Sequence, residues 1–428
     1  MGNNVVRVCK IRQIPHINKS RADKKGFDKM YISEKAKRVK PSSTLAIDSK
    51  FKAMKAEGID AVGFGTGEPD FDTPDEIKAA CIDALNRGVT KYTPASGTPD
   101  LKKAVCRKLL RDNGLTYQPT DIVISNGAKH SLTNIFMAIC NPGDEVIIPA
   151  PYWVSYPEMV AMADGKSVIL TATEENEFKI SAADFEAAIT PKTRAIVINS
   201  PSNPTGSVYT EEELRAIADV AVKHNIYVIS DEVYEHLTYD GAKHVSIASF
   251  GEDIKKLTIV VNAMSKTYAM TGWRIGYTAC EKELATAMAN IQSHATSNPN
   301  SFAQAAACVA LDGSLDCVNM MKAEFKKRRD YMHKRINEID GVSCILPQGA
   351  FYVMMNIDKI IGRTIYGKMI NGSDDFAELF LEKALVAIVP CSGFGVDNYL
   401  RWSYATSMES IEKGLDRLEK FLKEGLDK

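Results

Sequence analysis

Short apolar runs rich in β-branched residues alternate with helix-like patterns from about Pro74 to Ile339. Most of these runs are bounded by Gly, Pro, Asn or Asp, which mark turns. We expect strands at Ile122 to Ser125, Glu145 to Pro149, Val168 to Thr171, Ala195 to Asn199, Tyr227 to Ser230 and Leu257 to Asn262. Strands that alternate with helices are typical of a parallel sheet covered by crossover helices, so the predicted fold class is α/β.

The clearest helical pattern extends from Thr210 to His224. Thr210 can cap the helix, and Glu213 follows three residues later as in a capping box. One apolar face follows, made of Leu214, Ile217, Ala218 and Ala221. A long, charged helix is expected from Cys317 to Ile339, and beyond it the pattern changes to mixed short strands and helices. This change predicts a second, smaller lobe.

The length of the chain, 428 residues, also favours more than one core. We predict a large domain at residues 76–325 and a smaller domain built from residues 30–75 and 326–428. The first 29 residues carry eight Lys or Arg against two Asp and have no periodic apolar pattern. A transit peptide would be rich in Ser, and this segment has one, so a disordered appendage or an upstream start is favoured.

The composition argues against several classes of function. The chain is 45% hydrophobic and 25% charged with a formal net charge of -1, which gives no electrostatic footprint for nucleic acid or a membrane surface. No apolar stretch approaches the roughly 20 residues that a membrane-spanning helix needs. The nine cysteines are scattered without a CxxC pair or an adjacent His, so we expect no metal site and a soluble protein in a reducing compartment, the cytoplasm.

Polar residues follow several of the predicted strands. In an open α/β sheet, ligands bind beyond the carboxyl ends of the strands, so these positions are candidates for a site. After the first strand, Gly127, Ala128 and Lys129 begin a helix whose free N–H groups could hold a phosphate. After the fourth, the turn SPSNPTG presents Asn203. Taken singly, each also fits an ordinary turn or helix start.

Two further strands end in ionisable residues. Asp231 follows one strand, with Tyr234 three residues later, so that a carboxylate and a phenol can face one site. Lys266 follows the last predicted strand. Burying an unpaired ammonium is costly, and imine formation with an aldehyde cofactor is one reason to place a lysine there. A helix-capping Asp and an exposed loop Lys are the alternatives.

The motifs SPSNPTG, SDEVYEHL and SKTYAMTGWRIGY resemble those of the fold-type I, class I aminotransferases and occur in the family order. The resemblance extends from about Met30 to the C-terminus, through KPSSTLAI, TGEPDFDTP, KYTPASG, PGDEVIIPAPYWVSYPE and LRWSYAT. The subgroup that the chain resembles most is the Iβ aspartate aminotransferases. The resemblance implies a large domain with a mostly parallel seven-stranded sheet, a smaller α+β domain, and pyridoxal 5′-phosphate (PLP) as cofactor.

The resemblance also implies roles for individual residues. Lys266 would bind the cofactor as a Schiff base and shuttle the substrate proton, and Asp231 would keep the pyridine nitrogen protonated. Asn203 and Tyr234 would hydrogen-bond the cofactor's phenolic oxygen. Trp153 would stack on the ring and, with Asn203, also contact the substrate.

The phosphate of the cofactor would be held by the helix start at Gly127, Ala128 and Lys129, by Arg274, and by Tyr92 of a neighbouring subunit. The last contact implies a homodimer. Many relatives have a phosphate-binding Ser three residues before the lysine, whereas this chain has Ala263. The resemblance therefore implies a larger share of phosphate binding for Arg274.

Substrate contacts follow from the same resemblance. Arg401 would bind the α-carboxylate of the amino acid as a two-pronged donor, and the backbone of Gly67 would close over it. Lys129 and Lys40 are the cations that could bind the side-chain carboxylate of a dicarboxylic substrate. Both lysines could instead be solvated surface charges.

Several functions remain open at this point. The leading hypothesis is a ping-pong aminotransferase that moves the amino group of aspartate or glutamate to 2-oxoglutarate or oxaloacetate. Prephenate is an alternative acceptor, because KPSSTLAI with Lys40 and Thr44 also resembles relatives that accept it. A carbon–sulfur β-lyase shares the same residue set, although the two lysines argue against it. Gly63, Gly65 and Gly67 form GxGxG before Glu68 rather than the GxGxxG of a dinucleotide site.

Overall fold

The computed structural model describes residues 31–39, 43–65 and 67–426. The chain divides into two units, residues 1–38 and residues 39–428. Helix α1 (Glu34–Arg38) is the described element of the first unit, and all elements considered below belong to the second. The predicted appendage at residues 1–29 and the candidate substrate residue Lys40 lie outside the described residues.

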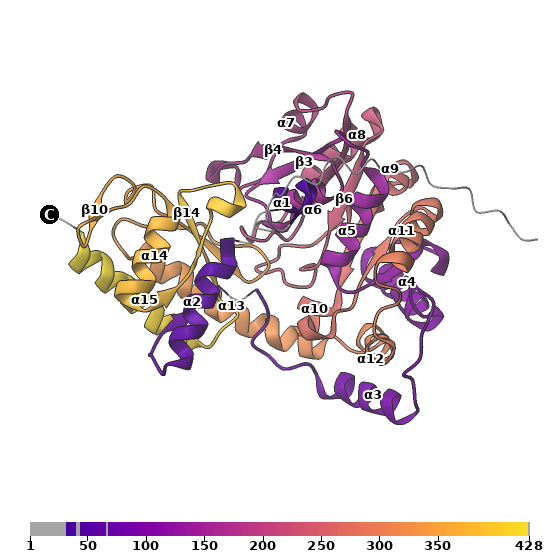
Figure 1. The fold of residues 1–428 in the computed structure, drawn as a ribbon, viewed down its shortest axis with the longest axis horizontal. Coiled ribbons are helices and arrows are strands. Elements are labelled where there is room, and N and C mark those ends of the chain that lie inside the picture. Colours follow the sequence, from indigo (N-terminus) through magenta and orange to yellow (C-terminus); the bar gives the residue numbers. More distant parts are fainter. Residues whose placement is uncertain (1–30, 40–42, 66, 427–428) are drawn as a thin grey trace, which may run out of the picture. The chain divides into compact units, whose positions relative to one another are not determined.

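A seven-stranded sheet forms the centre of the second unit (Figure 1). Its strands, in their order across the sheet, are β2 (Ile122–Ser125), β8 (Gly276–Ala279), β7 (Thr258–Ala263), β6 (Tyr227–Asp231), β5 (Thr193–Asn199), β3 (Glu145–Ala150) and β4 (Lys166–Thr171). β8 runs antiparallel to both of its neighbours, and the other pairs are parallel. The predicted α/β fold with a mostly parallel sheet is therefore confirmed, and all six predicted strands form.

Successive side chains of the strands point to opposite faces of the sheet, and both faces are covered by helices. On one face, Ile148 and its equivalents pack against α5 (Ala128–Ile139), α6 (Ser155–Met162) and α11 (Lys282–Ala295). On the other, Ile147 packs with α7 (Ala182–Ala187) and α8 (Glu211–His224), and Ile124 packs with α4 (Pro99–Asn113) and α12 (Ser301–Asp312). Burial on both faces explains why these strands are almost continuously apolar.

Helix α8 shows how local sequence sets an element's limits. The Thr210 side chain accepts a hydrogen bond from the Glu213 N–H, and the Glu213 carboxylate accepts one from the Thr210 N–H. This capping box fixes the first turn. At the other end, Asn225 adopts a left-handed conformation that stops the helix. The predicted helix at residues 210–224 is confirmed to within one residue.

The remaining elements include three small sheets. β9 (Tyr352–Asn356), β13 (Val389–Pro390) and β14 (Tyr399–Ser403) form an antiparallel sheet in the order β13-β14-β9. β1 (Val62–Gly63) pairs in parallel with β12 (Val386–Ala387), and β10 (Thr364–Ile365) pairs with β11 (Lys368–Met369). The helices around them are α2 (Ser43–Ala56), α13 (Asp316–Asn337), α14 (Ser373–Ala384) and α15 (Met408–Gly425).

These C-terminal elements surround a core that contains Phe380, Trp402 and Phe421, and this core continues to Tyr234 and Leu237, which follow β6. Figure 1 shows α14, α15 and β14 grouped together beside α2. β1 brings residues near the start of the second unit into this group through its pairing with β12. The predicted domain boundaries at residues 75 and 325 stay a prediction. α3 (Asp75–Asn86), α9 (Glu252–Leu257) and α10 (Met264–Thr267) complete the helices of the unit.

None of the helices in the described part of the chain combines the length and apolarity that crossing a membrane requires.

Candidate active site

A cavity of about 320 Å³ lies at the carboxyl edge of the large sheet. Strands β3, β5, β6 and β7 all end there, and β8 begins there because it runs in the opposite direction. The sheet therefore delivers residues from well-separated parts of the sequence to one place. Of the predicted site residues, the cavity is lined by Gly67, Ala128, Lys129, Trp153, Asn203, Asp231, Tyr234, Lys266, Arg274 and Arg401.

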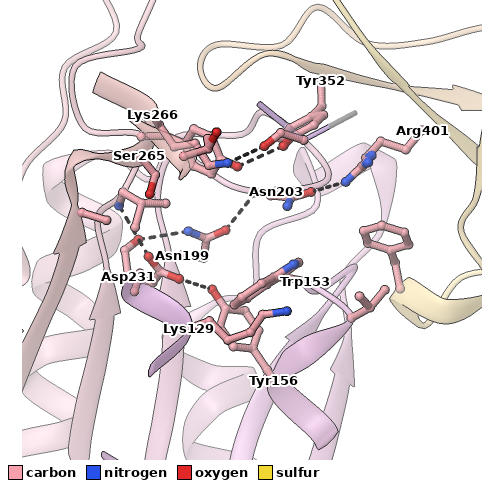
Figure 2. Close-up of a pocket in the computed structure, with 18 of the residues that line it drawn as sticks. Lys129, Trp153, Tyr156, Asn199, Asn203, Asp231, Ser265, Lys266, Tyr352 and Arg401 are labelled. Atoms are coloured by element: carbon pink, nitrogen blue, oxygen red, sulfur yellow. Dashed lines mark hydrogen bonds between the residues drawn. The ribbon is translucent and has the colours of Figure 1, made fainter. Parts of the chain in front are cut away.

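Lys266 lies in the short helix α10, which directly follows β7 (Figure 2). Its ammonium group donates a hydrogen bond to the backbone carbonyl of Gly67. The pKa of Lys266 is lowered to about 8, mainly by desolvation on burial and also by the nearby cations Arg401 and Arg274, while Glu68 and Asp231 oppose the shift. The amine is therefore far easier to deprotonate than an exposed lysine.

Asp231 is the last residue of β6 and is buried. Its Oδ2 accepts a hydrogen bond of 2.6 Å from the Tyr156 hydroxyl, and its Oδ1 accepts a longer one of 3.4 Å from the Val233 N–H. Burial raises the pKa of Asp231 to about 6, although the hydrogen bond from Tyr156 and the charge of Lys266 act in the opposite direction. The carboxyl group is thus ionised at neutral pH within an apolar setting.

Asn203 is held by Asn199, the last residue of β5. The Asn203 N–H donates to Oδ1 of Asn199 at 2.8 Å, and the Asn199 amide donates to the Asp231 carbonyl at 3.0 Å. The side-chain oxygen of Asn203 accepts a hydrogen bond from Arg401 Nη1 at 3.0 Å. The ends of β5 and β6 and the strand β14 are therefore linked through one chain of amides.

Arg401 reaches the cavity from the middle of β14, where its backbone pairs with Met354 of β9. Its Nη2 donates to the Gly65 carbonyl at 2.9 Å. The guanidinium lies 4.5 Å from the ring centroid of Tyr352 and 5.2 Å from that of Phe394, so aromatic faces hold it on two sides. Its Nε is buried and, among the described residues, has no hydrogen-bond partner, which leaves a donor for an anionic ligand.

A pair of phenols adjoins the arginine. The hydroxyls of Tyr234 and Tyr352 lie 3.0 Å apart, and both side chains are buried. Desolvation by burial holds the pKa of Tyr234 well above its usual value, so the phenol remains protonated and can donate.

The other end of the cavity is a helix N-terminus. Gly127 caps α5 with a positive φ of 84°, which favours glycine. Arg274 Nη2 donates to the Asn126 carbonyl at 3.1 Å, and Nη1 donates to the Thr271 carbonyl at 2.8 Å, so the guanidinium lies beside the cap. A Cβ on Gly276 would come 2.6 Å from the backbone nitrogen of Ala128. The first N–H groups of the helix stay accessible because that position is glycine.

Lys129 and Trp153 face each other at the mouth of the cavity. The Lys129 ammonium lies 4.9 Å from the Trp153 ring centroid. Burial, followed by repulsion from Arg274, lowers the pKa of Lys129. Together with Arg274 and Arg401, it makes the cavity attractive to anions.

Besides Gly127, which caps α5 next to the cavity, two other predicted site residues are not among its described lining residues. Tyr92 does not line the cavity, and its side chain is 91% exposed. Such exposure of a tyrosine leaves its face available to another chain. Lys40 lies outside the described residues.

Several lining residues escaped the sequence analysis: Tyr156, Asn199, Tyr352 and Phe394. Tyr156 and Asn199 lie just after β3 and at the end of β5, so their position at the carboxyl edge was a usable signal. Tyr352 and Phe394 come from segments whose return to the large sheet no local pattern indicates.

Comparison with known proteins gives a consistent result. A sequence model of the family described as "Aminotransferase class I and II" matches residues 59–418. The aspartate aminotransferase of Bacillus sp. (strain YM-2) is 47% identical over 395 residues, which cover 92% of this chain and 100% of that protein. The probable aspartate/prephenate aminotransferase of Rhizobium leguminosarum bv. phaseoli is 48% identical over 393 residues, covering 91% of this chain and 98% of that one.

Solved structures agree with the sequence relatives. The crystal structure of the aspartate aminotransferase from Rhizobium meliloti superposes with a TM-score of 0.90 at 42% identity and covers 93% of this chain and 100% of that chain. The aspartate aminotransferase from Thermus thermophilus with maleate gives a TM-score of 0.87 at 41% identity and covers 92% of this chain and 100% of that one.

Proposed function

This chain belongs to the class I and II aminotransferase family, and we propose that it moves the amino group of aspartate or glutamate to 2-oxoglutarate or oxaloacetate with PLP as cofactor. The reaction is ping-pong: the amino acid leaves as an oxo acid before the second substrate binds. The relatives named as aspartate aminotransferases, at 47% identity over nearly the whole chain, support the substrate class. The observation that carries the proposal is the joint presence of Lys266, Asp231 and Arg401 in one cavity.

The residues of the cavity fit PLP in chemistry and in space. An amine of lowered pKa can condense with an aldehyde, and a buried carboxylate can pair with a pyridinium. The N-terminus of α5, kept open by Gly276, and Arg274 suit a phosphate. When bound, PLP supplies an aldehyde that condenses with amines and a ring that withdraws electrons from the substrate.

Five residues that line the cavity have distinct roles in the proposed reaction. Lys266 would hold the cofactor and, when released, carry the proton removed from the substrate's α-carbon. Asp231 would keep the ring nitrogen protonated, and the Tyr234 hydroxyl and the Asn203 amide would bind the ring's phenolic oxygen. Trp153 would lie on the ring face.

Substrate binding is assigned to the cations of the cavity. Arg401 would bind the α-carboxylate with its free Nε and its fork, and the Gly67 backbone would close over the substrate. Lys129 would bind the side-chain carboxylate, and Lys40 is the second candidate for that task. Maleate, a dicarboxylate, is named with the Thermus thermophilus structure, which supports a dicarboxylic substrate.

A dimer completes the proposal. We infer that Tyr92, exposed in the single chain, binds the cofactor phosphate of a neighbouring subunit. The eight described cysteines are free, which supports the reducing environment of the cytoplasm as the location.

A visible absorption spectrum tests the proposed function. The protein loaded with PLP should be yellow, with a visible absorption band from the imine between PLP and Lys266. Lys266→Ala should lack this band because it cannot form the imine. Aspartate and glutamate should bleach it to the pyridoxamine form, and 2-oxoglutarate or oxaloacetate should restore it. A protein that stays colourless with PLP, or that reacts only with a cysteine conjugate and releases pyruvate, would contradict the proposal.

Prephenate is the second candidate acceptor. The relative from Rhizobium leguminosarum bv. phaseoli, named as a probable aspartate/prephenate aminotransferase, favours it. Restoration of the yellow band by prephenate, at a rate comparable to that with 2-oxoglutarate, would establish this activity. If 2-oxoglutarate restores the band and prephenate does not, prephenate is not an acceptor.

A further inference from the structure

The Asp231 carboxylate has one short hydrogen bond, and it comes from Tyr156. The hydroxyl donates to Oδ2 at 2.6 Å, whereas the backbone N–H of Val233 lies 3.4 Å from Oδ1. Figure 2 shows Tyr156 beneath Trp153, with its hydroxyl directed at Asp231. The orientation of the carboxylate therefore depends mainly on this phenol.

Packing fixes the position of the phenol. The Tyr156 side chain is 2% exposed and lies among Leu132, Ile148 and Val197 in the core beneath the cavity. Its ring meets Trp153 edge to face at 5.4 Å between centroids. The ring cannot turn away without opening this core, so the hydroxyl stays where Asp231 can accept from it.

The charges around Asp231 make this hydrogen bond consequential. Burial opposes ionisation of the carboxyl group, and the adjacent Glu232 adds repulsion. The Tyr156 hydrogen bond favours the charged form because a carboxylate is a stronger acceptor than a carboxylic acid. A donor at this position offsets part of the cost of keeping a buried anion.

We propose that Tyr156 is a positioning residue, whose hydroxyl holds the Asp231 carboxylate ionised and in one orientation so that it can pair with the ring nitrogen of bound PLP. This inference rests on the proposed function. Trp153 and Tyr156 flank the start of α6, so one short segment would both cover the ring face and anchor the carboxylate. Tyr156 acts through Asp231 and need not touch the substrate.

The test compares Tyr156→Phe with a matched control, Tyr239→Phe. Tyr239 is also 2% exposed, and its hydroxyl donates a hydrogen bond of 2.6 Å, in this case to the Ala350 carbonyl. Each variant removes one buried hydroxyl of the same geometry. We expect similar falls in melting temperature, so a difference in cofactor binding reports the role of Tyr156 rather than a general loss of packing.

Two readouts should separate the variants. The dissociation constant of PLP should rise by about tenfold or more in Tyr156→Phe, the effect of losing one hydrogen bond to a charged group, and change little in Tyr239→Phe. In the apo protein, the infrared carboxyl band assigned by its loss in Asp231→Asn should titrate about one pH unit higher in Tyr156→Phe than in the unsubstituted protein.

Equal PLP affinity and an unshifted carboxyl band in Tyr156→Phe would overturn the proposal. The proposal would also be overturned if this band showed that Asp231 is protonated at pH 8 in the unsubstituted apo protein. If the unsubstituted protein binds no PLP, the proposed function itself fails. If it binds PLP and transaminates while Tyr156→Phe behaves as Tyr239→Phe does, only the role of Tyr156 fails.

Discussion

Burial acts in opposite directions on the two oppositely charged groups at the centre of the cavity. It lowers the pKa of Lys266 to about 8 and raises that of Asp231 to about 6. Between these two values the carboxyl group is ionised, and an appreciable share of the amine is already neutral. Binding of an aldehyde that carries a basic ring nitrogen requires both groups in one enclosed space: a neutral amine to attack the aldehyde and an anion to pair with the protonated nitrogen.

The pH dependence of cofactor capture follows from the lysine. Only the neutral amine attacks an aldehyde, so the rate of PLP capture by the apo protein should rise with pH and level off above about 8. Because the folded protein disfavours the proton on Lys266, its stability should also rise with pH between about 8 and 10.5, while the unfolded chain still holds that proton. Stopped-flow absorbance from about pH 6 to about pH 10 measures the rate. A midpoint near 10.5 would contradict the expectation, and Lys266→Ala is the control.

The two proposed carboxylate-binding residues can be told apart by substrate. Arg401→Lys removes the planar fork from between Tyr352 and Phe394, and kcat/KM should fall about 100-fold or more for aspartate and alanine alike, a loss of roughly 3 kcal/mol. Lys129→Ala should lower kcat/KM for aspartate and leave the slow reaction of alanine nearly unchanged. Steady-state kinetics with both amino acids measure this. A loss confined to aspartate in Arg401→Lys would reverse the assignment.

At the scale of elements, the sequence predicts what is local and misses what depends on distant segments. β7 and α8 were predictable because an apolar run or a capping box lies within a few residues. β8 was missed as a strand: it has four residues, begins with Gly276, and forms by insertion between β2 and β7. Its reversed direction is nevertheless what brings Arg274 to the carboxyl edge.

The candidate site divides in the same way. Lys266, Asp231 and Asn203 were identified by their motifs, and the structure places them in one cavity. The residues that support them were not identified, because the partners are far apart in sequence: 75 positions separate Tyr156 from Asp231, and 118 separate Tyr234 from Tyr352. No periodic pattern encodes such pairs, since the fold alone brings them together.

The close contact between Gly276 of β8 and Ala128 of α5 can be tested by substitution. In Gly276→Ala the new methyl group would lie 2.6 Å from the Ala128 nitrogen, against backbone that cannot easily move, and would obstruct the helix N-terminus. We expect PLP affinity to fall at least tenfold, with about 1–3 kcal/mol lost in stability from overpacking. Affinity for pyridoxal, which lacks the phosphate, should fall much less.

The control for this substitution is Gly272→Ala, four residues earlier, where an added Cβ meets nothing within 4 Å. Equilibrium titration followed by absorbance measures both cofactor forms. Equal losses of PLP and pyridoxal affinity in Gly276→Ala would show that the helix N-terminus does not bind the phosphate.

At the scale of the whole molecule, the proposed role of Tyr92, whose side chain is exposed, predicts that a functional site requires two chains. Tyr92→Phe and Lys266→Ala chains should each be impaired alone. If Tyr92 acts across the interface, mixing them creates one intact site in each mixed dimer, and activity should recover to about a quarter of the native value at equal amounts. The measurement is activity after the subunits are exchanged under mild denaturant. Without recovery, Tyr92 would not act across the interface.

The pairing of β1 with β12 and the hydrogen bond from Arg401 to Gly65 have a consequence for synthesis of the chain on the ribosome. Arg401 and Gly65 lie 336 positions apart. At the usual pace of translation the ribosome needs roughly 20 to 70 seconds to pass from one to the other. Phe64, whose ring packs against Trp402 at 4.6 Å, therefore emerges long before its cover exists. During that interval the nascent chain presents an apolar segment that a chaperone can shield until the later strand arrives.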